Sequence, residues 1–429
     1  MTLSHAEYQA IANQLTPNGQ AFIDGKFCDA LDGEKFETTN PATGQVLASV
    51  AHCKATDVDR AVIAARRVFN AGTWSRAEPE ERKEVLLKVA ELVRKHTHEL
   101  AVLESMDTGK TINDCMDEIG GEVPNFFQWY AELADKTFGK IAPTGPGALA
   151  LITKEPAGIA GAVLPWNFPL VMAAWKIAPA LAVGCSAVLK PAEQTSLSAI
   201  RLAELMQEAG VPDGVINIVP GFGETAGKAI GLHNDIDTVS FTGSTEVGRM
   251  FMRYSGDSNL KGVGLEMGGK SPFIVLDDAL INDDLIEHAA MSAFWNGGQN
   301  CTANMRQLIA APLVEEFTGR ILERVKAFKL GDPLDPATDI GSMITKDHKA
   351  MVMNYIQSGV DEGANMLVGG ASDLPGYFIE PTVFQNVTPE MKIAREEIFG
   401  PVLGIMPIKT AEEALAVASD TEYGLHATV

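Results

Sequence analysis

The sequence predicts an α/β protein with two doubly wound, parallel-sheet regions, and three observations lead to this class. Short apolar strands alternate with helices from Gly158 onward. A second alternation of the same kind begins near Lys270. Such alternation is typical of parallel strands joined by crossover helices. The length of 429 residues also exceeds what one hydrophobic core usually organises, so we expect more than one domain.

The N-terminal third carries elements of another kind. Residues 1–55 contain short extended segments, FIDGKF and ETTNPATGQVLASV, separated by Asp-Gly, Asn-Pro and Thr-Gly turns. From Thr56 the apolar period predicts long amphipathic helices that end near Gly72 and Gly109, and a further helix over residues 125–135. The segment TFGKIAPTGPGALALITKEPAG, rich in Gly and Pro, predicts a hairpin-like excursion.

The two alternating regions supply the expected sheets. In the first, the predicted strands are GIAGAVL, SAVLKP, GVINIVPG and DTVSFTG, each followed by a helix. In the second, the strands are SPFIVL, RQLIAA and later segments around TVFQNV and GPVLGIMPI. Two helices of this region, DLIEHAAMSAFWNGG and VEEFTGRILERVKAF, have the amphipathic pattern that covers a sheet.

The net charge of the chain argues against two classes of binding partner, nucleic acids and membranes. Lys and Arg number 34 against 56 Asp and Glu, which gives a formal net charge of −22. An acidic surface repels phosphate backbones and anionic lipids, so we expect neither nucleic acid nor a membrane as partner, although the charge also serves solubility alone. The longest apolar stretch, residues 170–183, is interrupted by Lys176 and Pro179 and is too short for a membrane span.

Cysteine usage and the N-terminal residues predict a cytoplasmic protein. The first 15 residues lack the charged start and apolar core of a signal peptide. The five cysteines are odd in number and widely scattered, which does not suit a disulfide framework. They are Cys28, Cys53, Cys115, Cys185 and Cys301.

Two predicted strand ends carry polar groups where a doubly wound sheet binds ligands. The run Pro165-Trp166-Asn167-Phe168-Pro169 is either a structural turn or a turn that aims an amide donor at a ligand oxygen. Lys190 and Glu193 lie close together in the sequence at the end of the next predicted strand. They are either surface charges or a pair that binds a ribose, because a carboxylate accepts from both ribose hydroxyls.

Two glycine-containing loops compete as phosphate sites. The strand that ends in Phe241-Thr242-Gly243 leads into a helix whose first turn is Ser-Thr-Glu, and free N–H groups there suit a pyrophosphate. Upstream, Gly221-x-Gly223-x-x-Ala226 also fits a dinucleotide fingerprint. The residues alone leave both loops open.

Cys301 and Glu266 are the candidate reactive groups. Cys301 follows a Gly-Gly turn inside a run of small polar residues, a place that exposes a thiol, although a lone Cys is more often inert core. Glu266 lies just before Gly268-Gly269, a pair of glycines that permits another segment of backbone to come close. A Glu side chain exposed to solvent is nevertheless the simpler interpretation. The sequence contains no HExxH, no G-x-S-x-G and no Cys/His cluster, so metal catalysis and serine hydrolysis lack support.

Taken together, these residues resemble the aldehyde dehydrogenase superfamily over essentially the whole chain. The matching runs are PWNFP, VLKPAEQT, FTGSTEVG, LEMGGKSP, GQNCTA and EEIFGPV, in the family's order. The runs GDSNLKGVGLEMGGKS, HNDIDTVSFTGST and DPLDPAT are similar to the bacterial γ-glutamyl-γ-aminobutyraldehyde dehydrogenase branch.

The resemblance implies a role for each matching position. Cys301 would be the nucleophile and Glu266 the general base, while Asn167 and the Cys301 N–H would form the oxyanion hole. Residues implied to bind NAD are Pro165, Trp166, Lys190, Glu193, Gly223, Gly243, Ser244, Thr245, Glu246, Val247, Gly248, Met267, Glu397 and Phe399. Residues implied near the substrate are Glu122, Phe168, Met172, Trp175 and Thr302. No metal is implied, and the FTGST helix rather than the upstream loop would take the phosphates.

The resemblance also implies the domain organisation. Residues 1–137 and 157–267 would form a Rossmann-like NAD-binding domain, residues 138–156 a small β element for oligomerisation, and residues 268–429 the catalytic domain. We expect a homodimer or homotetramer. The family's pattern continues several dozen residues beyond Val429, so the expected catalytic domain would be incomplete at its C-terminal end.

The predicted function is NAD-dependent oxidation of an aldehyde to a carboxylic acid through a thiohemiacetal and a thioester on Cys301. Two alternatives are a non-catalytic structural or binding relative and a CoA-acylating dehydrogenase; Glu266 favours water over CoA as the acceptor. Glu122 is unexpected in an apolar tunnel wall and suits an ω-amino or γ-glutamylamino aldehyde, unless it points to solvent. Phe168 and Trp175 leave aromatic aldehydes open.

Overall fold

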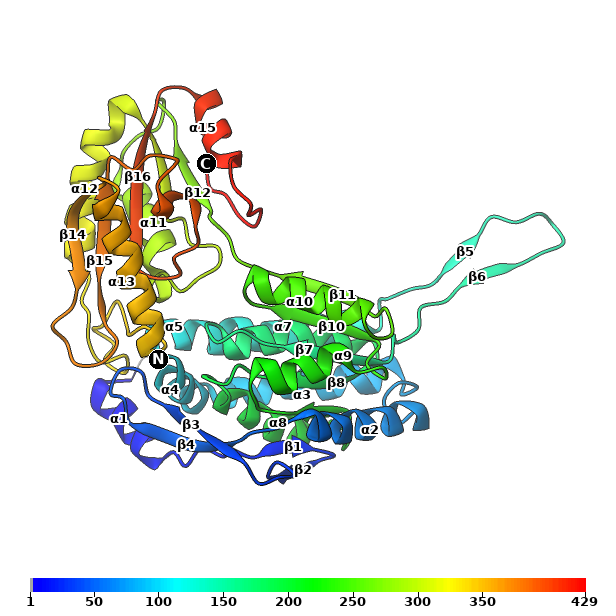
Figure 1. Ribbon diagram of the computed structural model, residues 1–429. Coiled ribbons are helices and arrows are strands. Elements are labelled where there is room, and N and C mark those ends of the chain that lie inside the picture. Colours follow the sequence, from blue (N-terminus) through cyan, green and yellow to red (C-terminus); the bar gives the residue numbers. More distant parts are fainter. Residues whose placement is uncertain (1–2) are drawn as a thin grey trace.

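A computed structural model describes residues 3–429, so Met1 and Thr2 of the N-terminal segment lie outside the described residues. Two separate sheets occupy two lobes of the molecule (Figure 1). One has seven strands in the order β11-β10-β7-β8-β9-β1-β2, and the other has five in the order β12-β13-β16-β15-β14. The α/β class with two largely parallel sheets is therefore confirmed.

The strands have the following bounds. The seven-stranded sheet contains β1 (Ala21–Ile23), β2 (Lys26–Cys28), β7 (Ile159–Val163), β8 (Ser186–Lys190), β9 (Ile216–Ile218), β10 (Thr238–Thr242) and β11 (Gly262–Glu266). The five-stranded sheet contains β12 (Pro272–Val275), β13 (Arg306–Ala310), β14 (Asn365–Ala371), β15 (Ile379–Gln385) and β16 (Val402–Ile408). Two antiparallel hairpins stand apart, β3 (Lys35–Thr39) with β4 (Val46–Ala51) and β5 (Lys140–Ala142) with β6 (Ala150–Ile152).

The helices connect and cover these sheets. In the first half they are α1 (His5–Gln14), α2 (Ala55–Ala71), α3 (Pro79–Lys95), α4 (Thr97–Thr108), α5 (Ile112–Asp117), α6 (Val123–Ala134), α7 (Pro169–Ala182) and α8 (Leu197–Ala209). In the second half they are α9 (Lys228–Leu232), α10 (Thr245–Gly256), α11 (Asp283–Phe294), α12 (Val314–Lys326), α13 (Lys346–Asp361), α14 (Lys392–Arg395) and α15 (Ala411–Ser419). The short turns η1 (Glu118–Glu122) and η2 (Gly223–Gly227) are π-helical, and η3 (Trp295–Gly298) and η4 (Ala311–Leu313) are 3₁₀.

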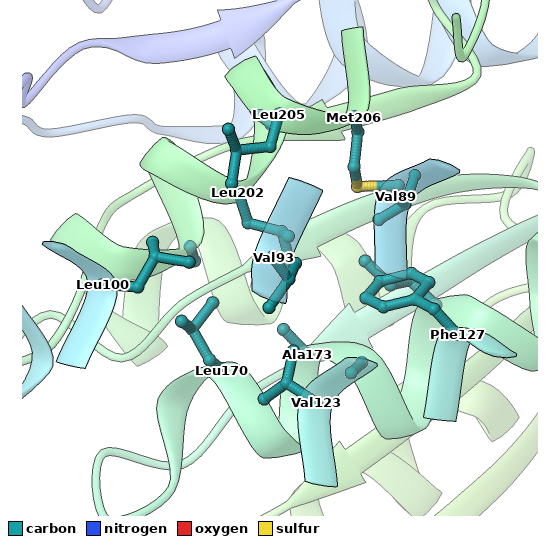
Figure 2. Close-up of a cluster of buried hydrophobic side chains, with 14 of the residues drawn as sticks. Val89, Val93, Leu100, Val123, Phe127, Leu170, Ala173, Leu202, Leu205 and Met206 are labelled. Atoms are coloured by element: carbon teal, nitrogen blue, oxygen red, sulfur yellow. The ribbon is translucent and has the colours of Figure 1, made fainter. Parts of the chain in front are cut away.

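The seven-stranded sheet is buried on both faces, as a doubly wound sheet requires. Along β8, Ala187 and Leu189 pack into one core with the helices α3, α4, α6, α7 and α8. Val188, which points the other way, packs into a second core with α2, α9 and α10. Figure 2 shows part of the first core, where Val93, Phe127 and Leu202 come together from three helices. This alternation explains why the strands read as continuous apolar runs.

Three features differ from the sequence-based expectations. Residues 5–14, for which no element was predicted, form helix α1, which Ser4 and Glu7 begin with a reciprocal capping box. The expected single helix over residues 79–108 breaks at His96. There the His96 ring bonds Glu99 at 2.7 Å, and Arg201 of α8 holds the same carboxylate at 2.6 Å. The break therefore follows a contact between distant segments.

The third difference concerns the edges of the sheets. Strand β14 pairs antiparallel with β15 at the edge of the five-stranded sheet. Strands β1 and β2 likewise form an antiparallel hairpin at the end of the seven-stranded sheet. Parallel strands were predicted because strands alternate with helices along the chain. No helix separates β14 from β15, so a tight connection joins them and β15 runs antiparallel to β14.

The hairpin β5–β6 projects away from the rest of the chain, as Figure 1 shows. It exposes large apolar side chains, among them Phe138 and Leu149, each 74% exposed. The role of this hairpin in oligomerisation stays a prediction. None of the helices in residues 3–429 is both long enough and apolar enough to cross a membrane.

Candidate active site

A cleft of about 460 Å³ lies where the two sheets face each other. Its walls include the carboxyl ends of β7, β8 and β10, which is where a doubly wound sheet binds its ligands. The opposite wall comes from the loop with Cys301, from α13 and from the segment before β16. Predicted site residues that line the cleft are Pro165, Trp166, Asn167, Lys190, Glu193, Gly223, Gly243, Ser244, Val247, Met267, Cys301, Glu397 and Phe399.

The Cys301 loop is shaped by three successive left-handed residues at the end of α11. Asn296, Gly297 and Gly298 have φ values of 52°, 61° and 69°. A side chain at Gly298 would place its Cβ 2.4 Å from the carbonyl oxygen of Gly400, so only glycine fits there. The Gly-Gly turn thus reverses the chain and presents Cys301, which is half-buried, to the cleft.

The Cys301 thiol sits in an environment that disfavours its charged form. Burial raises the pKa of the Cys301 thiol, and the carboxylates of Glu397 and Glu266 act in the same direction. The backbone N–H groups of Cys301 and Thr302 oppose this shift in pKa by donating toward the sulfur. The thiol is therefore accessible but needs an added positive charge or a base to reach the nucleophilic thiolate.

Asn167 joins the loop after β7 to the Cys301 loop. Its Nδ2 donates to the carbonyl oxygen of Gln299 at 2.9 Å, and Asn296 Nδ2 donates to the Asn167 carbonyl oxygen at 3.3 Å. Asn167 is only 5% exposed. A primary amide has two N–H donors, so one remains for a ligand in the cleft that Asn167 and Cys301 both line.

Glu266 ends β11 and is exposed rather than packed against the thiol. It is not among the residues of the described chain that line the cleft. It is nevertheless close enough to influence two groups, since its charge raises the pKa of Cys301 and opposes the lowering of the pKa of Lys176. Glu266 therefore lies at the rim of the site, at the end of β11, outside the lining of the cleft.

Sequence reasoning missed Lys176. This lysine of α7 is 9% exposed, and its Nζ donates to Ser240 Oγ at 3.0 Å and Thr242 Oγ1 at 2.7 Å. Burial lowers the pKa of Lys176 to about 8. The available signal was its position in an otherwise apolar helix, where a charged residue needs a specific partner.

Glu397 is fixed against the double glycine that follows Glu266. Its Oε1 accepts from the Gly269 N–H at 3.1 Å. A Cβ at Gly269 would lie 2.5 Å from the Cys301 carbonyl oxygen, so glycine permits this close approach. Burial raises the pKa of Glu397, while the Gly269 N–H and Lys270 oppose this. Gly269 thus contacts both the Glu397 carboxylate and the backbone of the Cys301 loop.

Lys190 and Glu193 form the pair expected at the end of β8. Lys190 is 2% exposed, and its Nζ donates to the Pro191 carbonyl oxygen at 2.8 Å and to Glu193 Oε2 at 3.2 Å. Burial lowers the pKa of Lys190, and the Glu193 carboxylate opposes that shift. Glu193 is half-buried and lines the cleft. Its other oxygen, Oε1, accepts from Gln194 Nε2 at a long 3.5 Å and retains a lone pair that can accept from a hydroxyl group of a ligand.

Both glycine-containing loops face the cleft. Ser244 caps helix α10, where its Oγ accepts from the Val247 N–H at 3.3 Å, and Gly243, Ser244 and Val247 line the wall. Gly223 and Gly227 of η2 line the same cleft. Thr245, Glu246 and Gly248, also named as NAD-binding residues, are not part of the described lining. Helix α10 is 12 residues long and has a side-chain cap at its N-terminus, whereas the 5-residue η2 has none, so α10 has the stronger dipole for an anion.

Three aromatic rings form one wall near Cys301. Trp166 lies 5.2 Å from both Phe399 and His348, measured between ring centroids. His348 Nε2 is 2.7 Å from the Phe399 carbonyl oxygen, and Phe399 itself has a φ of 58°. Burial lowers the pKa of His348, which favours the neutral ring with its proton on Nε2. Sequence reasoning missed His348, because nothing local to it indicates a cleft.

The predicted substrate residues lie outside the described lining of this cleft. Glu122 is exposed at the end of η1, and Trp175 is 48% exposed on α7 and stacks 5.3 Å from Phe126. Phe168 is buried at 6% exposure, and Met172 packs at the margin of the same core. Thr302 is half-buried beside the thiol. Their contact with a substrate stays a prediction.

The donor set of the cleft fits a dinucleotide. A half-buried carboxylate and a lysine stand at the end of β8, a capped helix N-terminus follows β10, and aromatic rings line the cleft together with Cys301. These groups match a ribose, a diphosphate and a planar ring in that order.

Comparison with known proteins shows the family of the chain. The chain matches the aldehyde dehydrogenase family over residues 27–429. It is 48% identical to an aminoacetaldehyde dehydrogenase of Pseudomonas aeruginosa, over 99% of this chain and 86% of that protein.

Two solved structures extend the comparison. The crystal structure of a γ-glutamyl-γ-aminobutyraldehyde dehydrogenase from Burkholderia cenocepacia superposes with a TM-score of 0.97 at 45% identity, covering 99% of this chain and 86% of that one. A variant of the P. syringae indole-3-acetaldehyde dehydrogenase AldA, in complex with NAD⁺, has a TM-score of 0.97 at 44% identity and covers 99% and 87% of the two chains.

Proposed function

Because this chain belongs to the aldehyde dehydrogenase family, we propose that it oxidises an aldehyde to a carboxylic acid, with Cys301 as nucleophile and NAD as hydride acceptor. The observation that carries the proposal is the contact across the cleft between the Asn167 amide and the Gln299 carbonyl oxygen at 2.9 Å. This contact holds an amide donor next to a thiol, the two groups that addition to a carbonyl requires.

The first step is addition of the Cys301 thiolate to the aldehyde carbon. The aldehyde oxygen becomes an oxyanion, and the second N–H of Asn167 and the Cys301 backbone N–H are the donors that stabilise it. These donors are fixed before the reaction, because Asn167 is buried and tied to the Cys301 loop. Fixed donors stabilise the charge at no cost of reorganisation in the transition state.

NAD would be held by Glu193 and Lys190 at its adenosine ribose, by the N-terminus of α10 at its diphosphate, and by Glu397 and Phe399 at its nicotinamide half. When bound, it supplies the hydride acceptor that allows the adduct on Cys301 to become a thioester. Its positive ring also favours the thiolate, which burial of Cys301 otherwise disfavours.

Glu266 completes the cycle by activating water. The thioester on Cys301 must be hydrolysed, and a carboxylate at the rim of the site can remove a proton from the attacking water. The exposure of Glu266 supports this role, because a side chain in contact with solvent can approach the thioester and release its proton afterwards.

The substrate we propose is an ω-amino or γ-glutamylamino aldehyde. Two relatives with such printed names, from P. aeruginosa and B. cenocepacia, support this assignment at 48% and 45% identity. Glu122 supplies a negative charge on η1, which packs against α7, the helix that carries Met172 and Trp175. A cationic amine is the complementary group.

The experiment is an assay of NADH formation with a panel of aldehydes. The panel contains 4-aminobutyraldehyde, aminoacetaldehyde, a neutral aliphatic aldehyde of equal length and an aromatic aldehyde. We expect turnover by the wild type and none by Cys301→Ala, with NAD binding and thermal stability retained in that variant. Turnover by a well-folded Cys301→Ala protein would refute Cys301 as nucleophile, and an inactive wild type would refute the proposed activity.

A further inference from the structure

A buried ion pair lies beneath the loop that carries Asn167. Lys110 and Glu118 are each 1% exposed, and Lys110 Nζ contacts the two Glu118 carboxylate oxygens at 2.8 Å and 2.6 Å. Burying two charges is costly even when they are paired, so such a pair adds little to stability compared with apolar residues. The proposed chemistry does not use either charge directly.

The lysine of this pair faces the buried ring of Phe168, the residue that follows Asn167. Lys110 Nζ lies 3.9 Å from the centroid of the Phe168 ring, a close cation–π contact in a dry environment, where such contacts are strongest. The Phe168 ring also packs against the Trp295 ring, with centroids 5.2 Å apart. Trp295 begins η3, the turn that leads to Cys301. Phe168 therefore connects the ion pair with both loops of the site.

Phe168 directly follows Asn167 and precedes α7. On the far side, the Leu170 N–H donates to Glu104 Oε2 at 3.2 Å, and Glu104 is fully buried. On the near side, the Asn167 amide is held by Gln299. The Phe168 ring is the anchor between these two attachments, so its position sets the direction of the residue before it.

We propose that Lys110, held in place by Glu118, is a positioning residue that fixes the Phe168 ring and thereby aims the Asn167 amide at the aldehyde oxygen. The inference rests on the function proposed above and adds a residue to it. Glu118 fixes the ammonium group over the ring and supplies the compensating charge. A purely structural role would stabilise the fold without affecting the reactivity of correctly folded molecules.

The test removes the two charges of the pair together, while Glu104 keeps its hydrogen bonds from Ser198 and from the Leu170 N–H. Lys110→Met combined with Glu118→Leu removes both charges at similar volume, and Phe168→Leu removes the ring. We measure the rate of the first turnover per active Cys301, kcat, KM, NAD affinity and thermal stability. Leu86→Ala is the matched control, because Leu86 is fully buried on α3 and its truncation destabilises the protein through a cavity.

We expect the double variant to lose about tenfold in first-turnover rate and kcat, a partial misalignment smaller than the hundredfold cost of an ångström of misplacement. NAD affinity should stay within about twofold, since none of the three residues lines the ribose and diphosphate end of the cleft. Phe168→Leu should cause a similar loss, and combining it with the double variant should add nothing further, because both act through one contact.

Three results would overturn the inference. These are an unchanged first-turnover rate in the double variant, additive losses on combination with Phe168→Leu, and an equal loss in Leu86→Ala. In each case an active wild type leaves the proposed function intact. An inactive wild type would instead overturn the proposed function, and this inference with it.

Discussion

The side-chain nitrogen of Asn167 lies 2.9 Å from the carbonyl oxygen of Gln299, two positions before Cys301, although the two residues are 132 positions apart in the chain. Together with the bond from Asn296 Nδ2 to the Asn167 carbonyl oxygen, this hydrogen bond holds the loop after β7 against the loop after α11. It also uses one of the two amide protons, which leaves the other for a ligand. The relative position of donor and thiol is thus fixed by the protein before any substrate binds.

Glu266→Gln should slow hydrolysis of the thioester more than its formation. An amide cannot take a proton from water, so acyl groups should accumulate on Cys301 during turnover. Intact-protein mass spectrometry after mixing with aldehyde and NAD would detect the adduct, and Cys301→Ala provides the control without it. Steady-state turnover equal to that of the wild type would exclude Glu266 as the base.

The reactivity of Cys301 should depend on pH in a way set by Glu397. Burial raises the pKa of Cys301, and Glu397 raises it further, so the thiolate fraction at neutral pH is smaller than for an ordinary cysteine. The alkylation rate of the apoprotein should therefore climb as pH rises through this raised pKa. Glu397→Gln removes a negative charge and should move the inflection to lower pH.

The measurement is the rate of iodoacetamide labelling of Cys301 across a pH series. Glu208→Gln is the matched control, because Glu208 is exposed on α8 and does not contribute to the shift in the pKa of Cys301. An inflection at the same pH in wild type and Glu397→Gln would contradict the electrostatic contribution of Glu397.

The ratio of NAD to NADP use should depend on Glu193. A carboxylate at the adenosine ribose accepts from both hydroxyls and repels a 2′-phosphate, while Lys190 offsets part of the repulsion. Glu193→Gln should raise kcat/KM for NADP relative to NAD by roughly tenfold, or about 1.4 kcal/mol, because Lys190 already offsets part of the repulsion between the like charges. Glu224→Gln makes the same charge change on the neighbouring η2 and should leave the ratio unchanged. Equal efficiency of the wild type with both dinucleotides would show that Glu193 does not discriminate.

A positively charged substrate end should be recognised through Glu122. Glu122→Gln should raise KM for 4-aminobutyraldehyde, by about 1–3 kcal/mol for a charge-assisted contact, and leave a neutral aldehyde of equal length unaffected. The exposure of Glu122 places the effect at the lower end of that range. Glu132→Gln, the same charge change on the adjoining α6, is the control. An equal effect on both aldehydes, or none, would refute the role of Glu122.

The sequence anticipated the strands of the parallel sheets and the polar residues at their ends, since both follow from local pattern. Alternating apolar strands and helices predicted β7, β8 and β10, and the strand ends pointed to Asn167, Lys190 and Gly243. The Gly-Gly turn before Cys301 could also be predicted from the sequence. Left-handed backbone and the close approach of another backbone segment both require glycine.

Other features of the fold and the site could not be predicted from the local sequence pattern. The break at His96 depends on Arg201 of another helix, and the antiparallel return of β14 depends on the strand beside it. Lys176 reaches Thr242 at the end of β10, and His348 lines the cleft, because segments distant in the chain meet there. No periodicity or motif around either residue encodes such a meeting.

What the sequence by itself determined is the set of chemical groups and the elements that carry them, because helix and strand patterns and turn residues act over a few positions. What only the tertiary structure decided is how those groups face one another. Packing joined Asn167 to Gln299, placed Lys110 over the Phe168 ring and left Glu266 at the rim. These relations are set by the burial of whole faces of sheets and helices, a property of the assembled core that no short segment contains.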